Sequence, residues 1–187
     1  MLSPDFKPEE GTCRKSLEWI ASQLDASDIE KMRIVTDGFK GENLSRDFYL
    51  RALSGKDGFI RKFFTADLNL RNAKVEYLNR ELGRPAGKDI MQIDGLGENS
   101  DADRINAIFT GRDLLERERS IDRYLWDKAD EITLFESFTL GKVLAIVVKL
   151  CIIERWLSLD PETGRSMLHK LTDDMRGTYG KIEFDTK

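Results

Sequence analysis

Histidine and cysteine are scarce in this sequence, and their scarcity restricts the chemistry that the chain can support. The 187 residues include one histidine, His169, and two cysteines, Cys13 and Cys151, which are far apart along the chain. Zinc sites use Cys and His ligands at short, regular spacing. A nucleophile–histidine pair would have to use His169, beside which no supporting pattern occurs. The sequence therefore predicts a surface histidine, no metal site, no cofactor site and no catalytic residues, so we do not expect an enzyme.

The sequence also lacks the marks of nucleic-acid binding, nucleotide binding and export. Its net charge of −4 offers no basic footprint for nucleic acid. Residues 95–100 lack the third glycine of a dinucleotide-binding loop, and no Gly-Lys pair is followed by the Ser or Thr of a phosphate-binding loop. The first residues do not combine basic side chains with an apolar stretch, as a signal peptide does. We therefore expect a cytoplasmic location and reduced cysteines.

Long apolar stretches are rare in this chain, in which 34% of the residues are charged, and the main one covers residues 134–157. Lys142 and Lys149 interrupt it, and each would cost about 2.5–3.5 kcal/mol near the middle of a bilayer. Seven residues make two helical turns, so both lysines fall on one stripe of a helix that is otherwise apolar. This pattern favours a helix buried in a bundle, with a solvated lysine stripe, over a membrane-spanning helix.

The rest of the chain has helical periodicity, few prolines and no internal repeat, which predicts an all-α fold. We expect a multi-helix antiparallel bundle with the long buried helix near its C-terminal end. A loose arm at 1–12 should precede one helical domain at 13–176, with halves 13–83 and 103–176 joined by loop 84–102. Residues 177–187 form a tail that is either disordered or a short strand. The expected helices cover 13–24, 26–35 (capped by Ser27), two or more segments of 43–82, then 103–129, 133–157 and 160–175, with a further short helix allowed at 87–93.

A charge-rich segment at residues 112–131 is the main candidate for a contact surface. Asp113 with Arg117, and Glu116 with Arg119, have the spacing of ion pairs on a helix. Such a face is either simply solvated or a contact surface for an elongated partner. If it is exposed, reversing the charge of Arg117 or Arg119 should leave folding intact. The candidate protein-contact residues are Glu116, Arg117, Glu118, Arg119 and Arg123.

Another group of polar residues lies in the preceding helical region, in the segment FTADLNLRNAKVEYLNREL. Asparagine is a mediocre helix former, so the presence of several asparagines in one predicted helix requires a structural explanation. We expect them either to bridge to neighbouring helices or to mark a local break in the helix at 67–69.

Two segments, FIRKFFTADLNLRNAKVEYLNRELGR at 59–84 and DLLERERSIDRYLWDKADEITLFESFTLGKVLAIVVKLCIIERWLSLDPETG at 113–164, resemble a known family in their content and order. The chain resembles bacterial helical proteins found in Bacteroidetes, of unknown function, whose genes accompany those of V-type ATPase subunits. The resemblance covers roughly residues 43–176. Its more specific parts are the LLERER and IIERWL segments.

This resemblance implies the role of the non-catalytic connector of these ATPases, the C-type subunit, whose eukaryotic counterpart is the d-type subunit. Such a connector would link the central shaft to the membrane rotor ring of a V-type proton- or sodium-translocating ATPase. Its expected partners are those subunits, with no nucleic acid and no membrane span of its own, and it would be cytoplasmic and peripheral to the inner membrane through the complex. The alternative is a helical protein-interaction module unrelated to the ATPase.

Overall fold

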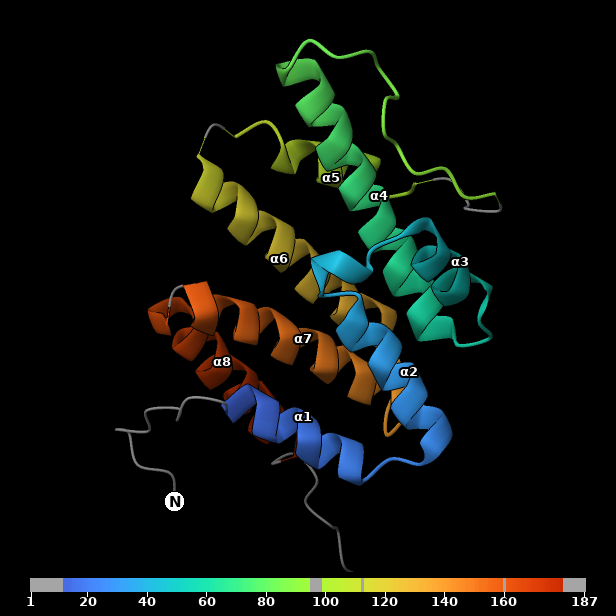
Figure 1. The fold of residues 1–187 in the computed structure, drawn as a ribbon. Helices are drawn as coiled ribbons and strands as arrows, with labels where there is room; N and C mark the ends of the chain where they lie inside the picture. Colours follow the sequence, from blue (N-terminus) through green and yellow to red (C-terminus); the bar gives the residue numbers. More distant parts are fainter. Residues whose placement is uncertain (1–11, 95–98, 112, 160, 180–187) are drawn as a thin grey trace, which may run out of the picture.

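The computed structural model is all-helical over the residues that it describes, which are 12–94, 99–111, 113–159 and 161–179 (Figure 1). No strand occurs in these ranges, so the predicted all-α class is confirmed. The elements are α1 (Thr12–Ser22), α2 (Ala26–Asp37), the 3-10 helix η1 (Gly41–Asn43), α3 (Arg46–Ser54), α4 (Gly58–Glu81), α5 (Ala102–Ile108), α6 (Leu114–Ile132), α7 (Leu140–Leu159) and α8 (Pro161–Tyr179).

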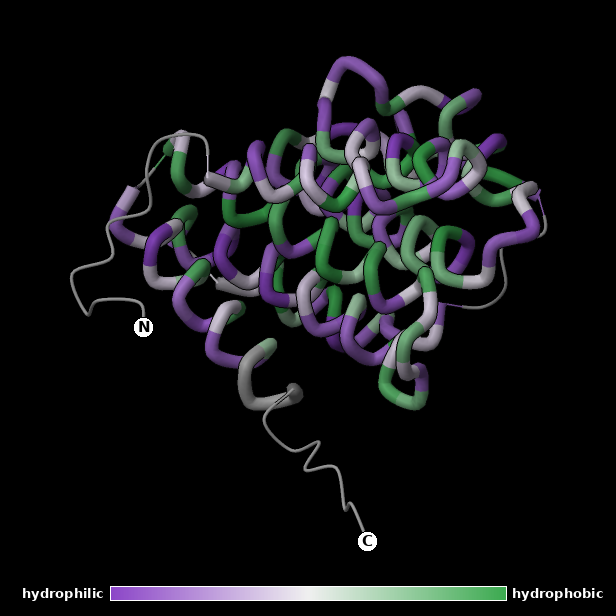
Figure 2. The backbone as a smooth tube through the Cα atoms, turned by 90° about the horizontal axis from the view of Figure 1, so that it is seen from below, coloured by the Kyte–Doolittle hydropathy of each residue, from purple (hydrophilic) through white to green (hydrophobic). Residues whose placement is uncertain are grey.

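Helix α7 lies at the centre of the C-terminal half and confirms the predicted long buried helix. It packs against α8, α2, α6 and α1, while α4 packs against α3, α6 and α5. The chain reverses direction between α6 and α7 and again between α7 and α8, as in an antiparallel bundle (Figure 1). Apolar residues gather along the inward sides of the helices, and polar residues cover the outside (Figure 2). Helix α6 therefore lies between the two groups of helices and contacts both.

The N-terminal half of the core is aromatic. The rings of Phe48 and Phe64 meet edge to face with centroids 5.1 Å apart, and those of Phe59 and Phe63 stack at 5.8 Å. All four side chains are buried, and both arrangements are favoured by the ring quadrupoles. A Cβ at Gly38 would collide with the Phe64 ring, so a glycine is needed where the end of α2 approaches α4.

The predicted solvated lysine stripe on α7 is wrong at Lys149. This side chain is buried, with its residue only 7% exposed, and it forms an ion pair with Asp130 of α6 at 2.7 Å. Its ammonium also lies 4.8 Å from the centroid of the Trp126 ring. Lys142, two turns earlier, is half-buried and lies near the start of the helix. The stripe is covered at Lys149 because α6 packs along that side of α7 and supplies a carboxylate and an aromatic face.

Several helix boundaries differ from the predicted ones because capping side chains define them. Asp25, not Ser27, caps α2 and accepts a hydrogen bond from the Asp28 backbone at 2.8 Å. The helix predicted at 103–129 is two helices, α5 and α6, because Asp113 caps a new start by accepting from the Glu116 backbone at 3.0 Å. The helix predicted at 133–157 begins only at Leu140 and runs to Leu159, so residues 133–139 form a loop.

Loop 84–102 contains turns and no helix at 87–93. Side chains of α4 hold it: Asn72 exchanges two hydrogen bonds with the Met91 backbone, at 2.9 and 3.0 Å, and Asn79 donates to the Lys88 carbonyl at 2.7 Å. The expectation that these asparagines bridge to other helices or break α4 is therefore wrong, because they bind the backbone of the following loop and α4 is continuous through 67–69.

The ends of the chain add two observations to this fold. The predicted arm at 1–12 lies outside the described residues except for Thr12, which begins α1. Residues 177–179 of the predicted tail continue α8, and 180–187 lie outside the described part of the chain. None of the described helices is long and apolar enough to cross a bilayer.

Candidate protein-contact surface

Helix α6 carries all five predicted contact residues, and the structure gives them different environments. Glu116 and Arg119 form the predicted ion pair at 2.9 Å, but only Glu116 is exposed. Arg119 is half-buried, with its guanidinium 6.0 Å from the centroid of the Trp156 ring of α7. Arg123 is exposed, and the described part of the chain gives it no ion-pair partner. Glu116 and Arg123 therefore keep the exposure that a contact surface requires, whereas Arg119 also packs against α7.

Arg117 is instead part of the packing between α6 and α4. Its guanidinium lies 4.5 Å from the centroid of the Tyr77 ring and donates to the Tyr77 hydroxyl at 3.0 Å and to the Gly111 carbonyl at 2.7 Å. The predicted pair with Asp113 is absent because the Asp113 carboxylate caps the helix. Arg117 therefore fastens the start of α6, and the expectation that it is a freely exposed charge is wrong.

Glu118 joins three helices. Its carboxylate accepts from Lys74 of α4 at 2.9 Å and from Arg155 of α7 at 3.4 Å. Burial alone would raise the pKa of Glu118, but the hydrogen bonds and charges of Lys74 and Arg155 outweigh burial and lower that pKa below its ordinary value. This residue is therefore engaged within the molecule.

Asp122, one turn further along α6, completes the same network. It is buried and accepts from Arg155 at 2.6 Å and from the Trp156 indole at 2.6 Å. Burial raises the pKa of Asp122 above its ordinary value although Arg155 opposes this shift. Asp122 was not among the predicted site residues, although its spacing of four from Glu118 puts both carboxylates on the face that meets α7.

Exposed apolar side chains are grouped at the far end of α6, in the loop at 133–139 (the α6–α7 loop). Leu134, Phe135 and Phe138 are 65%, 97% and 86% exposed. Phe138 has a φ of 57°, a left-handed conformation that a bulky residue rarely adopts. Glu136 accepts from the Thr139 hydroxyl at 2.6 Å, which fixes the turn before α7. These residues were predicted to lie in a buried helix, so their exposure as a contact site was missed.

A second exposed apolar group lies at the start of α6. Leu114 and Leu115 are 67% and 49% exposed. Scattered exposed leucines are normal on protein surfaces, whereas adjacent ones mark contact sites more often. The two groups therefore lie at opposite ends of one helix.

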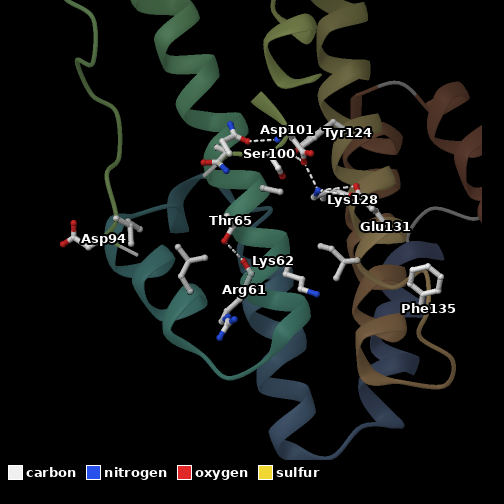
Figure 3. A pocket seen from close by; sticks show the side chains of 16 residues that line it. Arg61, Lys62, Thr65, Asp94, Ser100, Asp101, Tyr124, Lys128, Glu131 and Phe135 are labelled. Atoms are coloured by element: carbon white, nitrogen blue, oxygen red, sulfur yellow. Dashed lines mark hydrogen bonds and ion pairs between the residues drawn. The ribbon is translucent and has the colours of Figure 1, made fainter. Parts of the chain in front are cut away.

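A cleft of about 760 Å³ lies beside the C-terminal end of α6, between this helix, α4 and the loop that precedes α5 (Figure 3). At its inner wall Asp101 forms an ion pair with Lys128 at 2.7 Å and accepts from the Tyr124 hydroxyl at 2.9 Å. Burial would raise the pKa of Asp101, but these partners lower it. The side chains that frame the opening include Arg61, Lys62, Asp94, Glu131, Ile132 and Phe135.

Metal-binding and nucleophilic histidine and cysteine side chains are sparse in the described part of the chain. Within the described ranges, no three His, Cys, Asp or Glu side chains are placed to hold a metal ion together. Cys13 is fully buried, and burial together with the charge of Glu154 raises the pKa of its thiol to about 12. Burial likewise raises the pKa of Cys151 to about 12. Neither thiol is therefore an ionised nucleophile near neutral pH.

Comparison with known proteins gives one similarity. Residues 94–178, just under half of the chain, match the model of a family described as a protein of unknown function (DUF2764). The matched region contains α5, α6, α7 and nearly all of α8, and therefore both exposed groups on α6. No curated protein and no solved structure matches the chain. The chain is thus similar to an uncharacterised family, and the description of that family names no activity.

Proposed function

We propose that this chain is a non-catalytic structural connector that holds two partner proteins at a fixed separation. In the finer form of the proposal, the partners are the central shaft and the membrane rotor ring of a V-type ATPase. The chain would then be cytoplasmic and peripheral to the inner membrane through that complex. The resemblance described for residues 43–176 supports the ATPase assignment, and the geometry of α6 supports the connector role.

The observation that carries the proposal is the pair of apolar groups at the two ends of α6. Leu114 and Leu115 begin the helix, and Leu134, Phe135 and Phe138 follow its last turn. At 1.5 Å per residue, the 19 residues of α6 span about 28 Å. Exposed aromatic and aliphatic side chains are the usual anchors of protein interfaces. Two such groups on one helix suit a protein that bridges two partners.

A connector also needs a helix that does not slide under load, and α6 is fastened on two sides. Glu118 binds Lys74 of α4 and Arg155 of α7, while Asp122 binds Arg155 and Trp156. Lys149 of α7 adds a further ion pair to Asp130. Buried, hydrogen-bonded charges favour one defined arrangement of the helices over sliding alternatives, which supports the proposal.

Affinity purification of the tagged chain from its native organism tests this proposal. We expect recovery of V-type ATPase subunits, including shaft and membrane rotor components. Repeated recovery of a different complex would favour the helical interaction module unrelated to the ATPase. Purification of the chain alone, under conditions that preserve weak complexes, would contradict the connector role in both forms.

A further inference from the structure

The hairpin of α3 and α4 carries a local excess of positive charge on a chain whose net charge is −4. Residues 46–62 contain five cations and two acids, Asp47 and Asp57, so their net charge is 5 − 2 = +3. All five cations are exposed, and none has an ion-pair partner within the described part of the chain. By contrast, most of the basic side chains around α6 are paired. The five are Arg46, Arg51, Lys56, Arg61 and Lys62.

Two of these cations stand at the cleft beside α6. Arg61 and Lys62 line it from α4, and Ile132 and Phe135 line it from the end of α6 (Figure 3). Lys62 extends from α4 toward α6, and Phe135 lies on the opposite side of the opening (Figure 3). The cleft therefore presents a cationic wall, formed by Arg61 and Lys62, opposite the apolar pair Ile132 and Phe135 and the paired Lys128 and Glu131.

Among the described residues, no acid of the cleft forms an ion pair with Arg61 or Lys62. Asp101 is paired with Lys128 at 2.7 Å, and Glu131 contacts the same ammonium at 3.2 Å. Asp94 lies at the outer edge, where Figure 3 shows it pointing away from the opening. Arg61 and Lys62 thus remain available for negative charges from outside the molecule.

We propose that this cleft binds an acidic segment of a partner protein, with carboxylates against Arg61 and Lys62 and an apolar side chain against Ile132 and Phe135. This inference rests on the proposed function, because it specifies the chemistry of the partner at the C-terminal end of α6. A peptide fits better than a phosphate polymer, since it can place an apolar side chain against Ile132 and Phe135 next to its carboxylates. Charge complementarity of this kind steers association and selects among partners.

Fluorescence anisotropy with synthetic peptides tests the chemistry directly. The probe is a short labelled peptide of repeated Glu-Glu-Leu-Phe, and the control peptide repeats Lys-Lys-Leu-Phe. We expect the acidic peptide to bind, more weakly at about 0.5 M than at about 0.05 M salt, and the basic peptide not to bind. Tighter binding of the basic peptide, of a labelled single-stranded DNA or of vesicles of anionic lipid would overturn the proposal.

Variants locate the binding. Arg61→Glu with Lys62→Glu should weaken the acidic peptide about tenfold or more, and Phe135→Ser should weaken it several-fold. The matched control is Arg165→Glu with Lys170→Glu, two exposed cations of α8, which should leave affinity unchanged. All these residues are exposed, so circular dichroism should show folded proteins. Unchanged affinity of the Arg61, Lys62 double variant would overturn the proposal.

Purification from the native organism separates the two proposals. If the unaltered chain recovers partners and the Arg61→Glu, Lys62→Glu variant loses one of them, both stand. If the variant recovers the same partners in the same yield, the cleft proposal fails while the connector remains. If the unaltered chain recovers none, the connector fails, and peptide binding still decides whether the cleft recognises acidic segments.

Discussion

Lys149 shows how a single cation can be accommodated in the apolar helix of this molecule. A buried ammonium is costly unless it is paired, and Lys149 has both Asp130 at 2.7 Å and the face of Trp126 at 4.8 Å. The carboxylate of Asp130 is half exposed, so one partner of the pair stays solvated. Lys142 of the same helix is half-buried and has no ion-pair partner in the part of the chain that the structure describes, so the two lysines can be compared directly.

Lys149→Ala should therefore lower the free energy of unfolding by about 1–3 kcal/mol, through lost packing and a lost charge-assisted hydrogen bond. Lys142→Ala should change it by no more than about 0.5 kcal/mol, because this half-buried side chain has no ion-pair partner among the described residues. Urea denaturation of the two variants measures both values. Equal effects of the two substitutions would contradict the environments described for them.

Arg117 and Arg123 of α6 offer a second comparison, because Arg117 packs against Tyr77 whereas Arg123 is exposed. Arg117→Glu should destabilise the protein by about 1–3 kcal/mol, because it removes contacts to Tyr77 and Gly111 and places a carboxylate against an aromatic face. Arg123→Glu should have little effect on stability, since that side chain is exposed. Thermal melting followed by circular dichroism distinguishes them, and a stable Arg117→Glu variant would show that the Tyr77 contact contributes little.

The residue-scale errors of prediction have one physical origin. Periodicity shows which residues share a face of a helix, but it does not show which neighbouring helix covers that face. The stripe of Lys142 and Lys149 was correctly placed on one side of α7, and the arrival of Asp130 and Trp126 against Lys149 could not be read from spacing. The prediction that Arg117 is exposed was wrong for the same reason, because the Tyr77 side chain that it contacts lies 40 positions earlier in the sequence.

At the scale of elements, the contact between α7 and α8 depends on one glycine. Gly164 is buried in the first turn of α8, and a Cβ there would lie 2.7 Å from the Leu157 backbone nitrogen and 2.7 Å from its Cγ. Backbone cannot move aside as a flexible side chain does. Alanine normally stabilises a helix by about 1 kcal/mol relative to glycine. At Gly164 this gain in helix propensity is opposed by the steric cost of a Cβ against Leu157.

Gly164→Ala should lower stability by about 1–3 kcal/mol, because overpacking outweighs helix propensity. The matched control is Gly58→Ala at the start of α4, where a Cβ would meet nothing within 4 Å; it should be neutral or stabilising by up to about 1 kcal/mol. Chemical denaturation of both variants makes the comparison. A stabilised Gly164→Ala protein would mean that α8 can shift away from α7 at little cost.

The network between α4, α6 and α7 makes stability depend on pH. The folded-state pKa of Glu118 lies below its ordinary value of 4.5, so the contribution of this group is complete above pH 4.5 and is lost as pH falls through the lower folded pKa. Asp122 acts in the opposite sense: its folded pKa is raised above 3.8, so its ionisation reduces stability as pH rises through that window. Glu118→Gln should therefore flatten the loss of stability in acid, and Asp122→Asn should steepen it. Urea unfolding at a series of pH values below 5 measures these slopes, and identical slopes in all three proteins would contradict the assignment.

The existence and type of the helices were predicted, whereas two of the breaks between them were missed. Apolar side chains at helical spacing identified α1, α3, α4 and α8, and a continuous apolar stretch identified α7. Helix α2 was predicted from a capping signature at Ser27, although Asp25 is the residue that caps it.

The break between α5 and α6 was missed although Thr110 and Gly111, poor helix formers, precede Asp113, and Glu116 follows it at the spacing of a capped helix start. The loop at 133–139 was missed because Leu134, Phe135 and Phe138 extend the apolar stretch of α7. The candidate contact surface was therefore predicted only in part. The charged segment of α6 was predicted, but the exposed aromatic residues that follow α6 belong to an apolar stretch that predicted a buried helix.

At the scale of the whole molecule, the two apolar ends of α6 have a consequence that a single binding surface would not have. Helix α6 is held by α4 on one side and α7 on the other, so groups at its two ends keep a constant separation. A partner bound at Leu114 and Leu115 would be carried at a fixed distance from one bound at Phe135 and Phe138. Replacing either group should then remove one partner and leave the other.

We therefore expect separable losses when the two ends are altered. Leu114→Ser with Leu115→Ser should abolish recovery of one partner in purification from the native organism, and Leu134→Ser with Phe135→Ser and Phe138→Ser should abolish recovery of another. Each variant should keep the circular dichroism spectrum and melting temperature of the parent, because all five side chains are exposed. Quantitative mass spectrometry of the recovered proteins measures the outcome. Loss of the same partner from both variants would indicate one extended interface along α6, since a connector with independent ends requires the two losses to differ.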